Sequence, residues 1–239
     1  MTTFTFRPVL FMAAALTLLG CSQKSGVQAP GVVWQSVQEG NVQRLAKHLA
    51  AEPGLANAVD ETGNSLLYEA VSSPYTSVIK HLLANGAEVN YKNRFGRTPL
   101  HRAADEDREG VVRLLLDHGA DVNARDCRGS TALIVSAEFA TLPVIKLLVE
   151  AGADVPTGNH YGRSALHNAA KCEKTDVVKF LIEHGARLNQ VCEYGTPLDL
   201  TANCEIAEVL QASGGTASTD TSIASRTHQQ YLMSLPSER

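Results

Sequence analysis

The 239-residue sequence has few of the features that mark an enzyme or a metalloprotein. It contains no Cys-x-x-Cys, no His-Glu-x-x-His, no phosphate-binding loop and no Gly-x-Ser-x-Gly. Aromatic residues make up only 5% of the chain and the formal net charge is -4, so composition points to no class of partner. These absences predict a protein that is not an enzyme and that needs no cofactor or metal.

An apolar run long enough to cross a bilayer is also missing. The run at residues 9–19 follows a single cation, Arg7, and is shorter than the roughly 20 residues that a transmembrane helix needs. Such a run is typical of a signal peptide. It ends in Leu18-Leu19-Gly20-Cys21, which resembles the lipobox at which bacterial lipoproteins are cleaved and acylated.

The lipobox resemblance implies a signal peptide at residues 1–20 and an acylated Cys21 that anchors the protein in the periplasm. Ser22 stands where an inner-membrane retention signal has Asp, which implies the outer membrane. The alternative is an ordinary secretory signal with an unrelated cysteine. Residues 21–31 contain Ser, Gln, Gly and Pro without an apolar period, so they are expected to be a flexible tether.

A step of 33 residues recurs through most of the remaining chain. Glycine stands at 63, 96, 129, 162 and 195, and Gly-Ala pairs begin at 86, 119, 152 and 185. A fixed period of this length predicts stacked units that cannot fold alone. Within one unit, Thr98-Pro99 predicts a helix start, because Thr is a good N-cap and Pro fits the first helical position. Apolar residues at helical spacing in 111–116 predict a second helix.

The recurring residues resemble the ankyrin repeat: Thr-Pro-Leu-His at 98–101, Ala-Ala at 103–104, the apolar pairs at 111–112 and 115–116, Gly-Ala at 119–120, and Asn123. The resemblance implies an all-α solenoid of helix-turn-helix units joined by β-hairpin-like turns. It covers residues 32–212 as unit 1 (a cap, 32–59), unit 2 (60–92), unit 3 (93–125), unit 4 (126–158), unit 5 (159–191) and unit 6 (a shortened cap, 192–212). Residues 213–239 are predicted to be a polar, disordered tail.

Some positions depart from the ankyrin pattern. The glycine usual between the two helices of a unit is replaced in units 2 to 5 by Pro74, Asp107, Ala140 and Glu173. These links are therefore predicted to be less regular or differently shaped. Pro156 takes the place of an Asn that the other units have at 90, 123 and 189.

His101 and His167 are the residues that most resemble ligands. They lie 66 residues apart and are two copies of one repeat position, so they are predicted to hydrogen-bond to neighbouring backbone rather than to a metal or substrate. Ile134, the copy between them, lacks that bond.

Cysteine pairing depends on the export prediction, since the periplasm permits disulfides. Cys172 and Cys204 occupy equivalent places in units 5 and 6. Packed helices lie about 8–10 Å apart, whereas bridged cysteines need Cα atoms within about 7 Å, so a bridge requires unit 6 to lean toward unit 5. A Cys172–Cys204 disulfide and two free thiols both stay open.

The ankyrin resemblance implies that a partner is bound by the turn tips and the neighbouring link between helices. The predicted partner-binding residues are Arg94, Phe95, Arg97, Arg128, Phe139, His160, Tyr161, Arg163 and Tyr194. Phe95, Tyr161 and Tyr194 share one repeat position, which predicts a row of exposed aromatics beside arginine, the residue types enriched at binding hot spots. The alternative is that these rings pack on one another and stiffen the array.

Charge is expected to differ between the tips and the inner surface. Lys92 and Arg125 add to the basic tips, whereas Asp105, Glu106 and Glu138 make part of the inner surface acidic. An exported chain rarely meets nucleic acid, so a nucleic acid is not expected as the partner.

The expected function is that of a binding module, monomeric when free, that grips another protein. Anchored repeat lipoproteins are similar to immunity proteins that neutralise toxic effectors, such as lipases, in the periplasm. Two alternatives stay open: an accessory protein to a periplasmic catalase in oxidative defence, which some exported ankyrin proteins resemble, and a cell-envelope scaffold.

Overall fold

The computed structural model describes residues 29–219. The helices are α1 Gly31–Gln38, α2 Val42–Ala51, η2 Pro53–Asn57, α3 Leu66–Ser72, α4 Thr76–Ala84, α5 Pro99–Asp105, α6 Glu109–Asp117, α7 Ala132–Phe139, α8 Leu142–Glu150, α9 Ala165–Lys171, α10 Thr175–Glu183, η3 Pro197–Leu200 and α11 Cys204–Ala212. This part of the chain has no strand, only isolated antiparallel bridges that close three turns. The prediction of an all-α solenoid is confirmed. No helix in it is long and apolar enough to cross a membrane.

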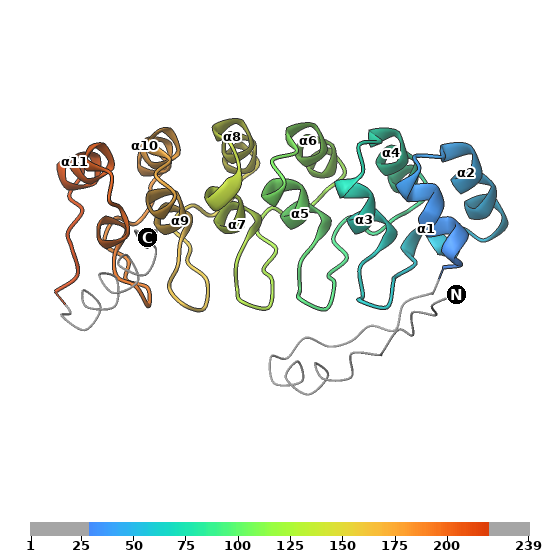
Figure 1. The fold of residues 1–239 in the computed structure, drawn as a ribbon, viewed down its shortest axis with the longest axis horizontal. Coiled ribbons are helices and arrows are strands. Elements are labelled where there is room, and N and C mark those ends of the chain that lie inside the picture. Colours follow the sequence, from blue (N-terminus) through green and yellow to red (C-terminus); the bar gives the residue numbers. More distant parts are fainter. Residues whose placement is uncertain (1–28, 220–239) are drawn as a thin grey trace, which may run out of the picture.

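The units stand side by side in one row (Figure 1). Helices α2, α4, α6, α8, α10 and α11 form one layer, and α1, α3, α5, α7, α9 and η3 form a second layer, which we call the palm. From the palm the turns before the first helices project in a common direction. We call the turns at 60–64, 93–97, 126–130 and 159–163 the fingers. The solenoid therefore presents one continuous surface made of fingers and palm.

The core is continuous between units because each helix buries residues at helical spacing. In α6, Val111, Val112 and Leu115 are buried, and they face buried residues of neighbouring helices in one cluster that runs along the array. Burying a side chain of this size stabilises the fold by about 1.5–3 kcal/mol. Since the neighbouring units supply the other walls of each pocket, no unit is stable alone.

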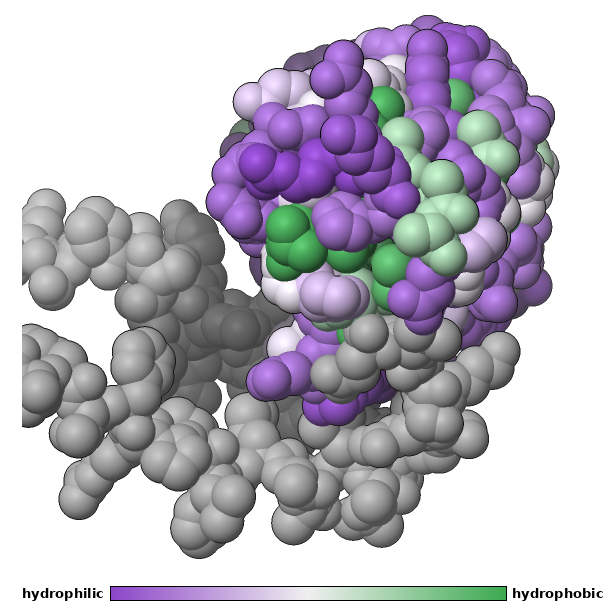
Figure 2. Space-filling view, turned by 90° about the vertical axis from the view of Figure 1, so that its right-hand side faces the viewer, coloured by the Kyte–Doolittle hydropathy of each residue, from purple (hydrophilic) through white to green (hydrophobic). Residues whose placement is uncertain are grey.

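Unit 1 closes the array at its N-terminal end. The side chain of Asn41 caps α2 by accepting the Arg44 N–H at 2.9 Å. Tyr75 of unit 2 lies so close to Gly40 that a Cβ there would stand 2.3 Å from the ring. Figure 2 looks onto this end, where apolar residues reach the surface in patches separated by hydrophilic ones. This mixed surface fits a cap that has no further unit to pack on.

The links between the two helices of a unit have two shapes. In units 3 and 5, Asp107 and Glu173 adopt φ of 53° and 55°, the left-handed conformation that glycine usually takes. In units 2 and 4 the first helix ends instead in extended residues, Ser73 and Ala140. The prediction of differently shaped links thus applies to units 2 and 4, whereas units 3 and 5 keep the glycine conformation with another residue.

Asparagine side chains connect the turn after the second helix of one unit to the equivalent turn of the next. Asn90 Nδ2 donates to Gly119 O at 3.0 Å, and Asn90 Oδ1 accepts the Asp121 N–H at 2.8 Å. Asn57, Asn123 and Asn189 make the same pair of bonds at their own junctions. Pro156 occupies this position between units 4 and 5 and has no side-chain group that could do so, so the ladder is interrupted there.

The array continues beyond the predicted boundary at residue 212. Thr216 N–H donates to Asn189 Oδ1 at 2.7 Å, and Ser218 N–H donates to Asp199 Oδ2 at 2.9 Å. The first bond repeats the asparagine ladder, so residues 213–219 begin a further turn over unit 6. The expectation of a disordered tail is therefore wrong for 213–219.

Three predicted segments fall on residues outside 29–219. They are the signal peptide at 1–20, Cys21 with most of the tether at 21–31, and the part of the predicted tail at 220–239.

Candidate protein-binding site

Each finger is held by the side chain of its first residue. Asn93 Oδ1 accepts the N–H groups of Phe95 and Arg97, both at 3.0 Å. Asp60, Asp126 and Asn159 make equivalent bonds in the other fingers. This local bond fixes the turn and leaves the side chains at its second and third positions pointing outward. The signal for it in the sequence is the Asp or Asn that stands three residues before the glycine of each of these four turns.

Neighbouring fingers also contact one another. The Cys127 N–H donates to Phe95 O, and the His160 N–H donates to Arg128 O, both at 2.9 Å. A Cβ added at Gly96, where φ is 71°, would stand 2.8 Å from Cys127 N, so only glycine permits this approach. The fingers therefore form a connected row rather than independent loops.

Two of the three predicted finger aromatics are open to solvent. Phe95 is 56% exposed and Tyr161 is 51% exposed. Tyr194 is half-buried, because the Arg163 guanidinium lies over its ring with Cζ 5.1 Å from the centroid. Of the described rings, the pair in contact is Phe180–His184, so the finger aromatics do not pack on one another. Phe139 is 65% exposed but ends α7, at the far end of the palm from the fingers.

The predicted finger cations fall into two groups. Arg97 donates from Nη2 to Asp105 Oδ2 at 2.8 Å, so its charge is neutralised within unit 3. Arg94 and Arg128 are exposed and form no ion pair within residues 29–219. Lys92 Nζ donates to the Arg125 carbonyl at 2.9 Å, and the Arg125 guanidinium donates to backbone carbonyls. Neither cation forms an ion pair with another described residue.

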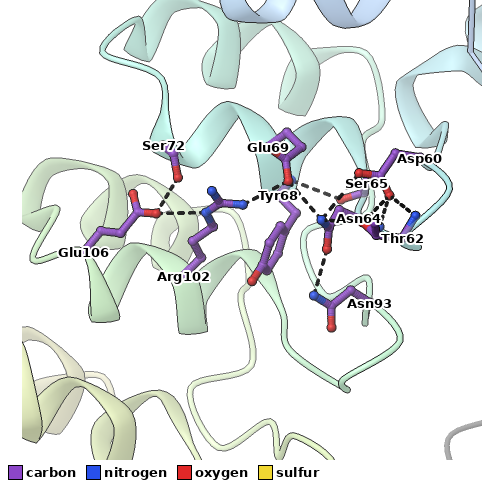
Figure 3. Close-up of polar contacts among 10 residues, drawn as sticks. All are labelled: Asp60, Thr62, Asn64, Ser65, Tyr68, Glu69, Ser72, Asn93, Arg102 and Glu106. Atoms are coloured by element: carbon purple, nitrogen blue, oxygen red, sulfur yellow. Dashed lines mark hydrogen bonds and ion pairs between the residues drawn. The ribbon is translucent and has the colours of Figure 1, made fainter. Parts of the chain in front are cut away.

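The palm of units 2 and 3 holds a network of paired charges (Figure 3). Arg102 donates from Nη1 to Glu69 Oε1 at 3.0 Å and from Nε to Glu106 Oε1 at 2.9 Å, and its guanidinium lies 4.8 Å over the ring of Tyr68. Ser72 Oγ donates to the same Glu106 oxygen. Burial raises the pKa of Tyr68, and the nearby Arg97 and Arg102 charges partly offset this.

Arg102 and Glu69 are not among the residues predicted from the sequence. The sequence signal for this ion pair is that the two opposite charges stand one repeat step apart. The step separates Glu69 from Arg102, and it also separates Glu138 from Lys171, whose charged atoms lie 3.7 Å apart.

The acids predicted on the inner surface are ion-paired. Asp105 pairs with Arg97, Glu106 with Arg102, and Glu138 with Lys171. Arg102 also pairs with Glu69, so one cation meets two carboxylates there and this part of the palm keeps a negative charge. On the fingers of units 3 and 4, Arg94 and Arg128 form no ion pair within residues 29–219.

His101 and His167 attach the palm helices to the next finger. His101 Nδ1 accepts the Thr98 N–H at 3.2 Å, so its proton lies on Nε2, which donates to Ser130 O at 3.1 Å. His167 makes the equivalent bonds to Ser164 N–H and Gly195 O.

Burial lowers the pKa of both rings, that of His167 to about 4. Both rings are therefore neutral at physiological pH. The prediction that they hydrogen-bond to neighbouring backbone is confirmed.

Cys172 and Cys204 are free thiols, so the disulfide alternative is not formed. Cys172 follows α9 and Cys204 begins α11, equivalent places in stacked units whose spacing of about 8–10 Å exceeds what a bridge permits. Burial raises the pKa of the Cys172 thiol. Within residues 29–219 no group of three or more His, Cys, Asp or Glu side chains could hold a metal ion.

The chain matches a model of a known protein family. The family model described as "Ankyrin repeats (3 copies)" matches residues 33–126 and 123–192, which is more than half of the 239 residues. No curated protein matches the chain.

Proposed function

Because the chain belongs to the ankyrin-repeat family, we propose that it is a protein-binding module anchored to the outer membrane through Cys21, and that in the periplasm it neutralises a toxic protein effector such as a lipase. The proposed partner-binding residues are Arg94, Phe95, Arg97, Arg128, Phe139, His160, Tyr161, Arg163 and Tyr194. Arg97 and Arg163 act in part by holding Asp105 and Tyr194 in place.

The observation that carries the proposal is the exposure of Phe95 and Tyr161 on the fingers of units 3 and 5. Arg94 and Arg128, on the fingers of units 3 and 4, have no carboxylate partner among the described residues. Aromatic and Arg side chains dominate binding hot spots. The fingers are fixed before any partner arrives, so binding loses little conformational entropy. A rigid row of this kind suits an inhibitor that covers a site on its target.

Catalysis by the chain itself is not part of the proposal. His101 and His167 are buried with both ring nitrogens engaged, and Asp105, Glu106 and Glu138 are ion-paired. A general acid or base must reach a substrate proton, which these side chains do not.

Photo-crosslinking in the source cells tests the proposal. A photoreactive amino acid is placed at Phe95 or Tyr161 of the full chain, with Arg113 on the opposite face of the array as the control position. We expect one exported hydrolytic effector to be crosslinked from both finger positions and not from Arg113. The same crosslinked proteins at all three positions would contradict binding by the fingers. A catalase or an envelope protein captured from the fingers would replace the immunity proposal with the accessory or scaffold function.

The anchor is tested separately. We expect a Cys21→Ala variant to lose metabolic labelling with palmitate and to leave the membrane fraction. Labelling that persists in this variant would contradict acylation of Cys21, without bearing on what the fingers bind.

A further inference from the structure

The charge of the exposed finger surface changes sign along the array. Glu61 on the finger of unit 2 and Glu193 in unit 6 are exposed acids at its two ends. Between them Arg94 and Arg128 are exposed, and so are Lys92 and Arg125; none of the four forms an ion pair within residues 29–219. The chain as a whole has a net charge of -4, so this local excess of positive charge runs against its overall balance. A partner segment with carboxylates complements this stretch and is repelled at both ends of it.

The third residue of each finger recurs at a regular spacing along this charged surface. Phe95, Arg128 and Tyr161 occupy the same position in units 3, 4 and 5, one repeat step apart. All three side chains are exposed, so they present ring, cation and ring in succession. Stacked units are separated by about 8–10 Å, the distance between packed helices.

A polypeptide in the polyproline II conformation matches this spacing. It rises about 3.1 Å per residue and has three residues per turn, so every third side chain faces the same way about 9.3 Å further on. In a β-strand, residues three apart point to opposite faces, so only one of the two would reach the row. Aromatic side chains such as Phe95 and Tyr161 are also the usual platforms for polyproline II segments.

We infer that the partner segment on the fingers is an acidic, polyproline II-like polypeptide with the pattern apolar-x-x-acidic-x-x-apolar. The acidic residue pairs with Arg128, and the two apolar residues pack on Phe95 and Tyr161. A second carboxylate near the first apolar residue pairs with Arg94. This inference rests on the proposed protein-binding function and names the chemistry of the segment that the same surface takes.

Synthetic peptides test the spacing with the full chain. The matched peptide has about 12 residues in a Pro-rich background, with one Glu three residues from each of two Leu. In the comparison peptide of identical composition, the Glu is moved by one residue. A third peptide is helical and carries the same three side chains seven residues apart, which places them on one face at about 10 Å spacing.

We expect the matched peptide to bind at least 10-fold more tightly than the other two by fluorescence anisotropy, and to weaken as salt rises. Arg128→Glu should reduce its affinity at least 10-fold, whereas Arg113→Glu on the opposite face should leave it unchanged. Equal or tighter binding of the shifted or helical peptide overturns the inference. So does displacement of the matched peptide by phosphatidylglycerol vesicles, which would assign the cations to lipid headgroups. If crosslinking from Phe95 captures a protein but these peptides fail, only the inferred chemistry of the segment falls.

Discussion

Units 3 and 5 differ from units 2 and 4 in how they are fixed to their neighbours. In units 3 and 5 a buried histidine, His101 or His167, bonds the palm helix to the next turn, and the link between the helices is left-handed. In units 2 and 4 the histidine position holds Tyr68 or Ile134, and the link is extended. The sequence period is one unit, but these bonding features repeat every two.

The two kinds of unit also interlock. An extended link leaves carbonyl groups at the end of the first helix without intrahelical partners. Arg108 of unit 3 donates to Val71 O and Ser73 O of unit 2, and Lys174 of unit 5 donates to Ala140 O of unit 4 at 2.6 Å. The exposed rings of Phe95 and Tyr161 both stand on the fingers of the histidine-bearing units. The histidine bonds join the first helices of these units to the turns that follow, at Ser130 and Gly195.

Removing a histidine should have the largest effect on this difference. His167→Leu leaves the Ser164 N–H and the Gly195 carbonyl without their buried partner, so we expect a loss of about 2–4 kcal/mol in the free energy of unfolding. Ile134→Val changes the same repeat position in unit 4 and should remove only about 1 kcal/mol. Urea unfolding of the full chain compares them. Equal losses would show that the histidine bonds do not distinguish the units.

Low pH should lower the stability of the units that contain His101 and His167. The His167 pKa is about 4 in the folded chain, below the usual value of about 6.5 for histidine, and burial lowers the His101 pKa as well. The unfolded chain therefore binds more protons as the pH falls from 6.5 to about 4, and His167 alone removes up to about 3 kcal/mol across this window. The stability difference between wild type and His167→Leu, measured by urea unfolding, should shrink as the pH falls. A difference independent of pH would contradict a buried neutral ring.

The bonds by which Arg108 of unit 3 holds unit 2 should have the next largest effect on stability. Arg108→Met deletes the donors to Val71 O and Ser73 O and should lower the free energy of unfolding by about 1–2 kcal/mol. The matched control is Arg113→Met in α6, the helix that Arg108 precedes; its exposed pair with Glu109 at 3.4 Å should contribute about 0.5 kcal/mol or less. Thermal unfolding of both variants compares them. Similar small shifts in Tm would mean that the Arg108 bonds do not stabilise the contact between units 2 and 3.

Restoring the interrupted ladder should stabilise the array. Pro156→Asn supplies the amide that bridges every other described junction of this kind, so we expect a gain of about 1 kcal/mol. Asn123→Ala deletes the bonds to Gly152 O and Asp154 N–H and should give a loss of similar size. A Pro156→Asn variant no more stable than wild type in urea would mean that the backbone at this junction is not placed for the two bonds.

The smallest expected effect is a difference in stability between glycine substitutions at the two left-handed links. Glu173→Gly relieves an unfavourable φ and should stabilise by about 0.5 kcal/mol. Asp107→Gly should bring no gain, because Asp107 Oδ1 accepts from Thr141 N–H and Oγ1 at 2.8 and 2.9 Å. Unfolding midpoints that move in the same direction would contradict a bridging role for Asp107.

The period predicts the helices because a Ser or Thr before the first helix and a Gly after the second helix recur in units 2 to 5. Thr98-Pro99 begins α5, and the glycines at the ends of the second helices adopt positive φ as expected. Which side chains pair with one another is harder to predict from the repeat pattern. The bond of Arg97 to Asp105 and the stacking of Arg163 on Tyr194 depend on how a side chain folds back over the palm or the next finger.

Composition misleads at the C-terminal boundary. Residues 213–219 are rich in Gly, Ser and Thr and have the composition of a linker, yet they bond to unit 6 and to Asn189. The sequence does contain a signal for this turn. Asn189 stands at the repeat position whose side chain bonds to the next turn at the other junctions, which predicts a further turn after unit 6. Exposure of Phe95 and Tyr161 followed from the repeat position, whereas the sharing of Arg102 between Glu69 and Glu106 could be assigned only from the geometry of the structure.

The affinity of the full chain for the protein captured from Phe95 tests the central claim, that the fingers of units 3 and 5 bind the partner. We expect Phe95→Ala with Tyr161→Ala to weaken that affinity about 100-fold, as hot-spot aromatics do. Arg113→Ala on the opposite face should leave it unchanged. An unchanged affinity in the double variant would contradict the account.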